Sequence, residues 1–261
     1  MSFKYHTILI VGATSGIGFA LAEKMINNGC HVIASGRRQD KLDKLRNKHG
    51  GQNINTVNFD ITDLEGIPAF VNSVTKSYPE LDCVILNSGI QRPLDFTKPE
   101  SIDLSNVNTE LTTNYLSHLH LTKEFLPFLQ LQSSPTALIY TTSGLALTPI
   151  LRCGNYCASK AAMHHLILVM REQLKDTNVK VIELLPPAVQ TELHDEDKQP
   201  DIKNGRSFGM PLDEFTDHAW KGLCEGKSDI PVGEHTIKGY QTFEADRQNA
   251  FKGVVEMMKK M

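Results

Sequence analysis

Residues 7–28 read TILIVGATSGIGFALAEKMINN, an apolar run that passes through a glycine-rich turn into a helical segment. The run Thr7–Val11 is typical of a buried strand, and Phe19–Asn28 is helical in character. The three glycines of the turn stand where the strand gives way to the helix. A tight turn explains one glycine, but three at this junction of a first βαβ unit favour a phosphate-binding turn. The stretch therefore predicts a dinucleotide-binding α/β fold.

Short apolar runs recur along the chain with helical segments between them. After the first strand they are His31–Ser35, Ile54–Asn58, Cys83–Leu86, Thr136–Tyr140 and Lys180–Leu185. Continuous apolar strands that alternate with helices indicate a parallel sheet covered on both faces. Two longer helices are expected at about 108–131 and 155–176. No linker rich in Gly, Ser or Pro divides the chain, so residues 1–261 are predicted to form one doubly wound α/β domain.

Composition excludes several classes of protein. The chain has 261 residues, of which 40% are hydrophobic and 22% charged, with a formal net charge of −3. Such a chain favours neither nucleic acid nor an anionic membrane as a partner. Five cysteines without a CxxC pair suggest neither a disulfide framework nor a zinc site, and no other metal site is expected. The first apolar run is too short for a signal peptide, and none reaches the roughly 18 residues that span a bilayer, so a cytoplasmic protein is expected.

The turn after the first strand has the residues that a phosphate group needs. Small residues let the backbone approach a pyrophosphate, and the next helix presents free N–H groups and the positive end of its dipole. The residues expected to line this site are Gly12, Thr14, Ser15, Gly16, Ile17 and Gly18.

The end of the second strand indicates which dinucleotide is bound. An NAD site normally carries an acid about 20 residues after the glycines. Here Gly36 is followed by Arg37 and Arg38, and no acid occurs before Asp40. Guanidinium groups suit a 2′-phosphate, so the sequence predicts NADP(H) as cofactor, with NADPH preferred over NADH. For Arg38 the alternative, a solvated residue in the first turn of the next helix, is favoured.

Tyr156 and Lys160 stand four residues apart on the expected helix 155–176, so their side chains share a face. A free tyrosine has a pKa near 10, and a nearby cation favours the phenolate. Lowering that pKa by about three units would need roughly 4 kcal/mol. The pair is a candidate for proton transfer, although a pair at this spacing is by itself common on helix surfaces.

Several motifs in a fixed order add to this pair, and together the chain resembles the short-chain dehydrogenase/reductase family over residues 7 to about 191. The motifs are the turn Gly12–Gly18, the segment Leu86-Asn87-Ser88-Gly89, Asn114, Ser143, and Tyr156 with Lys160. The resemblance implies a Rossmann-like fold with a seven-stranded parallel sheet.

The resemblance also implies roles for individual residues. Tyr156 would be the general acid/base, Lys160 would lower its pKa and bind the nicotinamide ribose, and Ser143 would hydrogen-bond the substrate oxygen. Asn114 would hold a water that links Lys160 to solvent; a harmless exposed position would explain it equally well. The further cofactor contacts that the resemblance implies are Asp60 and Ile61 at the adenine, Asn87, Ser88 and Gly89 at the fourth strand, and Pro186, Val189 and Thr191 near the nicotinamide.

The sequence departs from the family pattern at two places. The family usually has two asparagines before a small residue and glycine, where this chain has Leu86-Asn87-Ser88. It usually has Pro-Gly after the sixth strand, where this chain has Pro186-Pro187. The second change stiffens the turn beside the nicotinamide.

The predicted function is hydride transfer between NADP(H) and the carbonyl or alcohol of a small, uncharged or weakly polar substrate. The loop 192–215 and the segment Gln91–Asp95 are expected to line the substrate pocket. A non-catalytic NADP(H)-binding sensor or scaffold protein is the alternative, disfavoured because such a protein does not need Ser143, Tyr156 and Lys160 together. A sugar-nucleotide epimerase is disfavoured because only about 70 residues follow Thr191.

The resemblance implies a homodimer or homotetramer, since helices of this family also build subunit interfaces. Two apolar helix faces are candidates for the core or for this contact. They consist of Leu111, Tyr115 and Leu119 on one helix and Leu166, Val169 and Met170 on the other.

Overall fold

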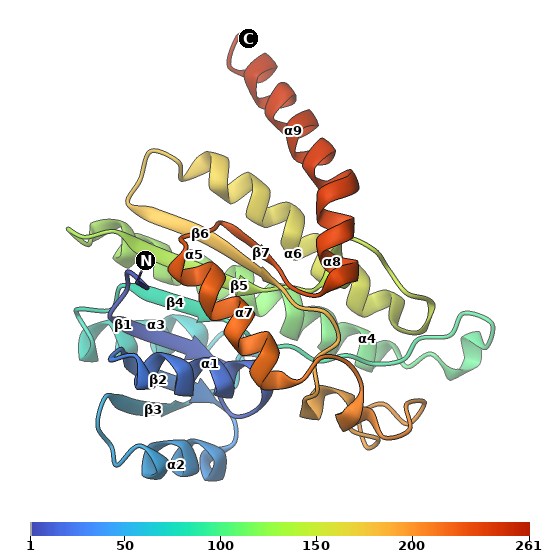
Figure 1. Ribbon diagram of the computed structural model, residues 1–261, viewed down its shortest axis with the longest axis horizontal. Coiled ribbons are helices and arrows are strands. Elements are labelled where there is room, and N and C mark those ends of the chain that lie inside the picture. The colour runs from blue at the N-terminus through green and yellow to red at the C-terminus, as the bar shows by residue number, and fades with distance from the viewer. Residues whose placement is uncertain (1) are drawn as a thin grey trace.

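The computed structural model of the protein describes residues 2–261, and its centre is a seven-stranded parallel sheet with the strand order β3-β2-β1-β4-β5-β6-β7 (Figure 1). The strands are β1 (Thr7–Val11), β2 (His31–Gly36), β3 (Ile54–Asn58), β4 (Cys83–Leu86), β5 (Thr136–Thr141), β6 (Val179–Leu185) and β7 (Asp229–Pro231). The predicted doubly wound parallel sheet is confirmed. The order reverses between β1 and β4, and open sheets bind ligands beyond the carboxyl ends of the strands at such a point.

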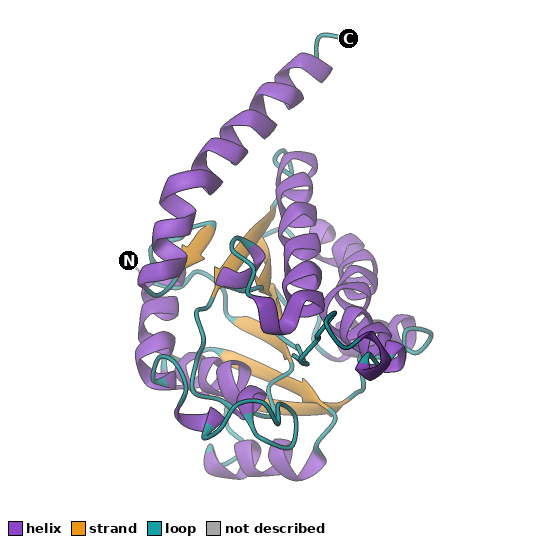
Figure 2. Ribbon diagram, turned by 90° about the vertical axis from the view of Figure 1, so that its right-hand side faces the viewer, coloured by secondary structure: helices purple, strands orange, loops and turns teal. Residues whose placement is uncertain are grey.

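Helices cover both faces of the sheet (Figure 2). They are α1 (Gly16–Asn27), α2 (Gln39–Lys48), α3 (Ile67–Ser77), α4 (Leu104–Leu111), α5 (Ser117–Leu131), α6 (Gly154–Gln173), α7 (Leu212–Cys224), α8 (Glu234–Gly239) and α9 (Ala245–Met258). A single π-helical turn, Thr112–Leu116, joins α4 to α5, and a second one, Tyr240–Glu244, joins α8 to α9. The predicted helix 108–131 is thus the continuous stretch from α4 to α5.

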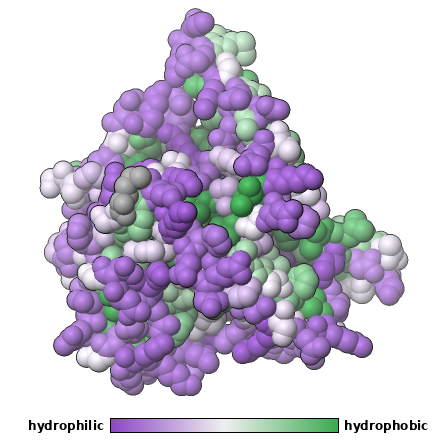
Figure 3. All heavy atoms as spheres, in the orientation of Figure 1, coloured by the Kyte–Doolittle hydropathy of each residue, from purple (hydrophilic) through white to green (hydrophobic). Residues whose placement is uncertain are grey.

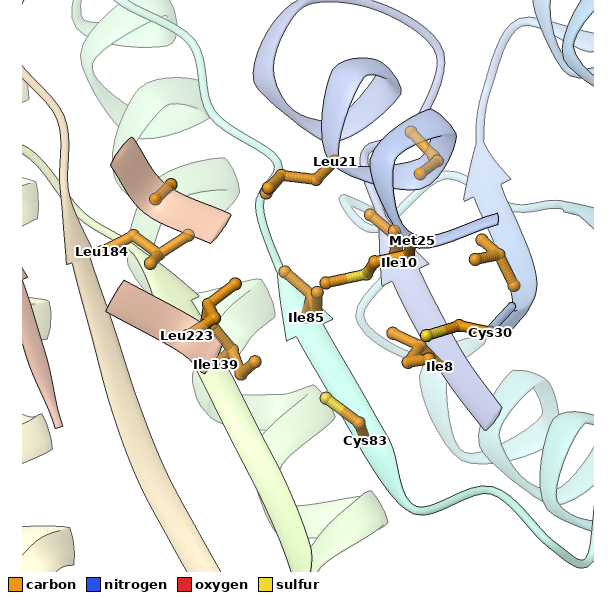
Figure 4. Packing of buried hydrophobic residues seen from close by; sticks show 14 of the residues in the cluster. Ile8, Ile10, Leu21, Met25, Cys30, Cys83, Ile85, Ile139, Leu184 and Leu223 are labelled. Atoms are coloured by element: carbon orange, nitrogen blue, oxygen red, sulfur yellow. The ribbon is translucent and has the colours of Figure 1, made fainter. Parts of the chain in front are cut away.

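The strands alternate between two cores because successive side chains of a strand point to opposite faces. Ile8 and Ile10 of β1 pack with α1, α2 and α7 on one face, where Leu21, Met25 and Leu223 approach the sheet (Figure 4). Leu9 and Val11 pack with α3, α5 and α6 on the other face. Burial on both sides explains why these strands read as continuous apolar runs.

The last helix differs from the others in its packing. No residue of α9 is buried, and the helix leads away from the sheet toward the C-terminus (Figures 1 and 2). The face seen in Figure 3 is largely hydrophilic, with hydrophobic residues gathered at its centre and right. Within residues 2–261, no helix combines the length and the apolar character that crossing a bilayer requires.

Candidate active site

One large cleft, with a volume of about 1230 Å³, follows the carboxyl ends of the strands. It brings together eighteen of the predicted site residues from the ends of β1 to β6 and from α6. They are Gly12, Thr14, Ser15, Gly16, Ile17, Arg37, Arg38, Asp60, Ile61, Asn87, Ser88, Gly89, Ser143, Tyr156, Lys160, Pro186, Val189 and Thr191. Two predicted residues, Gly18 and Asn114, lie behind its wall.

The glycine turn is shaped by close backbone contacts. Gly12 has a φ of +91°, and a Cβ atom there would lie 2.6 Å from the Ser88 hydroxyl oxygen. At Gly18 a Cβ would lie 2.2 Å from the Gly12 carbonyl oxygen, the same oxygen that accepts a hydrogen bond from Asn87 Nδ2 at 3.0 Å. Gly18 therefore serves the packing of α1 against the turn, and Gly12 leaves the turn close to β4.

The N-terminus of α1 opens on this cleft and is suited to an anion. Its N-cap residue, Ser15, makes no side-chain cap, and the first turn carries no acidic residue. The free N–H groups and the positive end of the helix dipole are therefore not neutralised by an acid of the same turn. Together with the glycine turn, this arrangement fits the pyrophosphate of a dinucleotide.

The two arginines after β2 both belong to the cleft. Arg37 is 61% exposed at its side chain and lies 3.5 Å from Asp60 Oδ2. Arg38 donates to Thr14 Oγ1 and Ser15 Oγ and forms an ion pair of 2.6 Å with Glu192. The interpretation of Arg38 as a solvated helix residue is therefore wrong, because the guanidinium folds back over the glycine turn.

Asp60 stands at the far end of the cleft, where the adenine was expected. Its Oδ1 atom accepts hydrogen bonds from the amide and the hydroxyl of Thr62, at 3.0 and 2.8 Å. Burial acts to raise the pKa of Asp60, but these hydrogen bonds and the nearby Arg37 outweigh it and lower the pKa. The carboxylate is thus charged at neutral pH and holds the loop after β3 in place.

Ser143 and Tyr156 both line the cleft. Both residues are 6% exposed, and the Ser143 Oγ atom accepts a hydrogen bond from the Leu145 amide at 3.0 Å. Burial raises the pKa of Tyr156, and the nearby Ser143 hydroxyl only partly opposes this. The pKa of Tyr156 is therefore raised and not lowered as expected, because Cys153, Cys157 and Glu110 act in the same direction as burial. At neutral pH the phenol keeps its proton.

Lys160 lies beside Tyr156, and its ammonium is hydrogen-bonded to the end of β5. Its Nζ atom is 5.6 Å from the centre of the Tyr156 ring and donates to the carbonyl of Thr141 at 2.8 Å. Burial lowers the pKa of Lys160 to about 8, although the charges of Glu183 and Glu110 act to raise it. A Cβ at Gly89 would lie 3.4 Å from this ammonium, so the glycine leaves room over it.

Asn114 is buried within the π-helical turn between α4 and α5. It accepts a hydrogen bond from the Ile90 amide and donates to the Ile90 carbonyl, both at 2.9 Å, and it also donates to Ser159 Oγ at 3.0 Å. The alternative of an exposed position is therefore wrong. Asn114 joins the segment after β4 to α6, and a π-helical turn is a common feature of functional sites.

The turn after β6 forms the floor of the cleft. Pro186 accepts a hydrogen bond from the Gly144 amide at 2.8 Å, and Pro187 packs against Gly233, where a Cβ would approach to 3.0 Å. Thr191 packs against Gly16 and caps the short helix that follows. The second proline thus fits a place that a glycine of the neighbouring segment leaves open.

The segments that were expected to line the substrate pocket contribute only part of the lining of the cleft. Of Gln91–Asp95, only Gln91 and Arg92 line the cleft, and the end of the predicted loop 192–215 is already the first turn of α7. The opposite wall consists of His235, Thr236, Lys238, Gly239, Thr242 and Phe243. These residues belong to no motif that could be recognised in the sequence. Their place in the cleft follows from the fold, in which Thr236 packs against Gly144.

A buried chain of charges lies beneath the site and was not expected from the sequence. His164 of α6 binds Glu183 of β6 through Nδ1 and Glu244 through Nε2, both at 2.9 Å, and all three side chains are fully buried. Glu183 also accepts a hydrogen bond from Thr142, the neighbour of Ser143. Burial would lower the pKa of His164, but its bonds to the two carboxylates raise the pKa to about 9.

Similarity to known proteins agrees with this geometry. Residues 6–201 match the family described as short chain dehydrogenase. The chain is 35% identical over 231 residues to the uncharacterized oxidoreductase DltE of Bacillus subtilis strain 168, covering 88% of this chain and 89% of that protein. It is 30% identical over 186 residues to serine 3-dehydrogenase of Agrobacterium fabrum, covering 71% and 73%.

Among solved structures, a short chain dehydrogenase from Burkholderia cenocepacia J2315 in complex with NADP has a TM-score of 0.77 at 24% identity. That similarity covers 96% of this chain and 97% of the other. The chain belongs to the short-chain dehydrogenase family, whose members are oxidoreductases that act on alcohol and carbonyl groups of small molecules. The predicted resemblance is confirmed. Within residues 2–261, no cluster of three or more His, Cys, Asp or Glu side chains is arranged to hold a metal ion.

Proposed function

We propose that the protein is an NADP(H)-dependent reductase in which Tyr156 donates a proton to a substrate carbonyl. The observation that carries this proposal is the position of the Ser143–Tyr156 pair in the same cleft as the glycine turn and the two arginines. A bound nicotinamide cofactor would supply the hydride. Because that chemistry belongs to the cofactor, the protein's part is to orient the reactants and to provide the proton.

In the proposed reaction, the substrate oxygen accepts hydrogen bonds from Ser143 and Tyr156. Burial keeps the phenol of Tyr156 protonated, so it can give its proton to the alkoxide that develops on that oxygen. The ammonium of Lys160 stabilises the phenolate that remains. Asn114 fixes the position of α6 relative to the segment after β4 through its hydrogen bonds with Ile90 and Ser159. In the direction of alcohol oxidation the same proton returns to Tyr156.

The preference for NADPH is part of the proposal. Arg37 and Arg38 place two guanidinium groups at the end of β2, where an NAD site would have an acid. Arg37→Asp is expected to weaken NADPH binding far more than NADH binding, as measured by titration calorimetry. Arg46→Asp, an exposed change on α2 outside the cleft, is the control. Equal losses for both cofactors with Arg37→Asp would contradict the preference.

The catalytic role is tested by Tyr156→Phe. The variant should bind NADPH like the wild type but lose about 10²- to 10⁴-fold in turnover of carbonyl compounds. Tyr78→Phe removes a phenol outside the cleft and should leave turnover unchanged. Unchanged turnover in Tyr156→Phe would refute the assignment. A wild type that binds NADPH but reduces no member of a broad carbonyl panel would favour the alternative, a non-catalytic sensor or scaffold protein.

We further propose a cytoplasmic location. All five cysteines are free thiols and four of them are buried, as is usual for proteins of reducing compartments. Fractionation of cells that express the protein would test this location.

A further inference from the structure

An ion pair spans the cleft between the β2–α2 connection and the loop after β6. Arg38 Nη1 and Glu192 Oε2 are 2.6 Å apart, although the two residues are 154 positions apart in the chain. The other edge of the guanidinium binds Thr14 and Ser15 of the glycine turn. The edge that Glu192 covers therefore belongs to the cleft, where both residues are part of the lining.

Glu192 is charged in this position. Burial acts to raise its pKa, but Arg38, Ser15 and Lys198 outweigh this and lower the pKa. The side chain of Glu192 is 22% exposed and that of Arg38 is 39% exposed, so the pair is half-buried rather than free in solvent. A full negative charge thus lies on the arginine that the proposed function assigns to the 2′-phosphate.

We propose that Glu192 is a cofactor-specificity residue whose carboxylate competes with the 2′-phosphate of NADPH for Arg38. The inference rests on the proposed function, because it takes Arg38 as a phosphate ligand. A 2′-phosphate carries up to two negative charges against one on the carboxylate, and the two anions repel each other across one guanidinium. NADPH therefore breaks the Arg38–Glu192 pair, whereas NADH, which has only a hydroxyl group there, leaves it closed.

The opening of this pair affects the loop that follows Glu192. Lys198 Nζ donates to the Glu192 carbonyl at 3.2 Å, and Gln199 Nε2 donates to the carbonyl of Leu193. Leu193, His194 and Lys198 line the substrate side of the cleft. The choice of cofactor is thereby linked to the part of the protein that meets the substrate.

The decisive variant is Glu192→Gln, which keeps the size of the side chain and removes its charge. Titration calorimetry with each cofactor should show that NADPH binds about three- to tenfold more tightly than to the wild type. NADH binding should stay within about twofold. Asp197→Asn is the matched control, because it removes the same charge from an exposed position of the same loop that lies outside this cleft. Unchanged or weaker NADPH binding in Glu192→Gln would overturn the proposal, and so would an equal gain in Asp197→Asn.

A second measurement uses the wild type alone. Limited digestion with trypsin should cut after Lys198, Lys203 or Arg206 faster when NADPH is bound than when NADH is bound. Equal cutting with both saturating cofactors would also overturn the proposal. If the wild type binds NADPH no better than NADH, the proposed cofactor preference is refuted, and this inference, which depends on it, is refuted as well. If Arg37→Asp loses NADPH binding but Glu192→Gln gains none, only the role of Glu192 is refuted.

Discussion

Burial controls the protonation of the two residues at the centre of the cleft. It raises the pKa of the Tyr156 phenol and lowers the pKa of the Lys160 ammonium to about 8, so the two groups are neutral and charged, respectively, at pH 7. This combination suits carbonyl reduction, in which the phenol begins with its proton and the ammonium is needed once that proton has left.

The pH dependence of the reaction should show the loss of the Lys160 charge. Its ammonium is fully present well below pH 8 and is lost as the pH rises through about 8, so kcat/KM for carbonyl reduction should fall over that interval. Arginine stays charged at every accessible pH, so Lys160→Arg should lack this alkaline limb even if its overall rate is lower. Profiles of kcat/KM from pH 6 to pH 10 for both proteins test this. An identical limb in both would assign the ionisation to another group.

At the residue scale, the sequence indicates which chemical groups a site contains better than it indicates their burial and their partners. The glycine turn could be predicted because its residue types follow from backbone contact. Tyr156 and Lys160 were singled out by their spacing together with the motifs of the family, and their catalytic roles stay predictions. The position of Arg38 could not, because it depends on Glu192, which lies 154 residues away. The pKa of Tyr156 depends in the same way on burial, which no spacing of residues reports.

Three elements meet at the buried chain of charges around His164. The histidine lies on α6, Glu183 on β6, and Glu244 at the end of the π-helical turn before α9, where Arg247 and Gln248 also bind Glu244. This chain anchors the segment that forms the opposite wall of the cleft to β6, whose Glu183 also binds Thr142 next to Ser143. Buried charges are costly unless each is paired, so the paired side chains hold α6, β6 and the π-helical turn together.

Removal of the histidine should destabilise the fold strongly. His164→Leu leaves Glu183 and Glu244 without the cation between them, which should lower the free energy of unfolding by about 3–5 kcal/mol. Urea denaturation measures this change. His120→Leu, at an exposed position on α5, is the control and should change stability by less than about 0.5 kcal/mol. A loss below about 1 kcal/mol in His164→Leu would show that the pair contributes little.

Deprotonation of His164 should lower the free energy of unfolding at alkaline pH. The pKa of His164 in the folded protein is raised to about 9, above the value near 6.5 of an unfolded chain. Its stabilisation is therefore complete below about pH 6.5 and is lost as the pH rises through about 9. The free energy of unfolding of the wild type should decrease between pH 7 and pH 10 more steeply than that of His164→Leu. Parallel curves would contradict this account.

At the level of elements, the predicted strands agree with the structure to within one residue because their apolar runs are continuous. The seventh strand has only three residues, Asp229–Pro231, and is too short to leave a pattern. The π-helical turn at Asn114 was equally invisible, since its extra residue is fixed by hydrogen bonds to Ile90 and Ser159 from other elements.

For the whole molecule we propose a homodimer or homotetramer. Two helix faces that sequence reasoning singled out remain partly uncovered, with Leu111 of α4 37% exposed and Val169 of α6 40% exposed. Exposed apolar side chains on such faces favour contact with a second copy. Light scattering should give a mass of two or four chains, and Val169→Glu should lower it. A single species of monomer mass for the wild type would rule the assembly out.

The wall made of His235, Thr236, Lys238, Gly239, Thr242 and Phe243 has a consequence for how such proteins diversify. The family match ends at residue 201, so this wall comes from sequence outside the region that carries the family's shared pattern. Under the proposed function, part of the substrate contacts is therefore encoded outside the stretch that carries the proposed catalytic residues, whereas Leu193, His194 and Lys198 lie inside it. On that proposal, mutations in the later stretch should change substrate preference while Tyr156 and the glycine turn stay intact, and exchanging that stretch between relatives would test this.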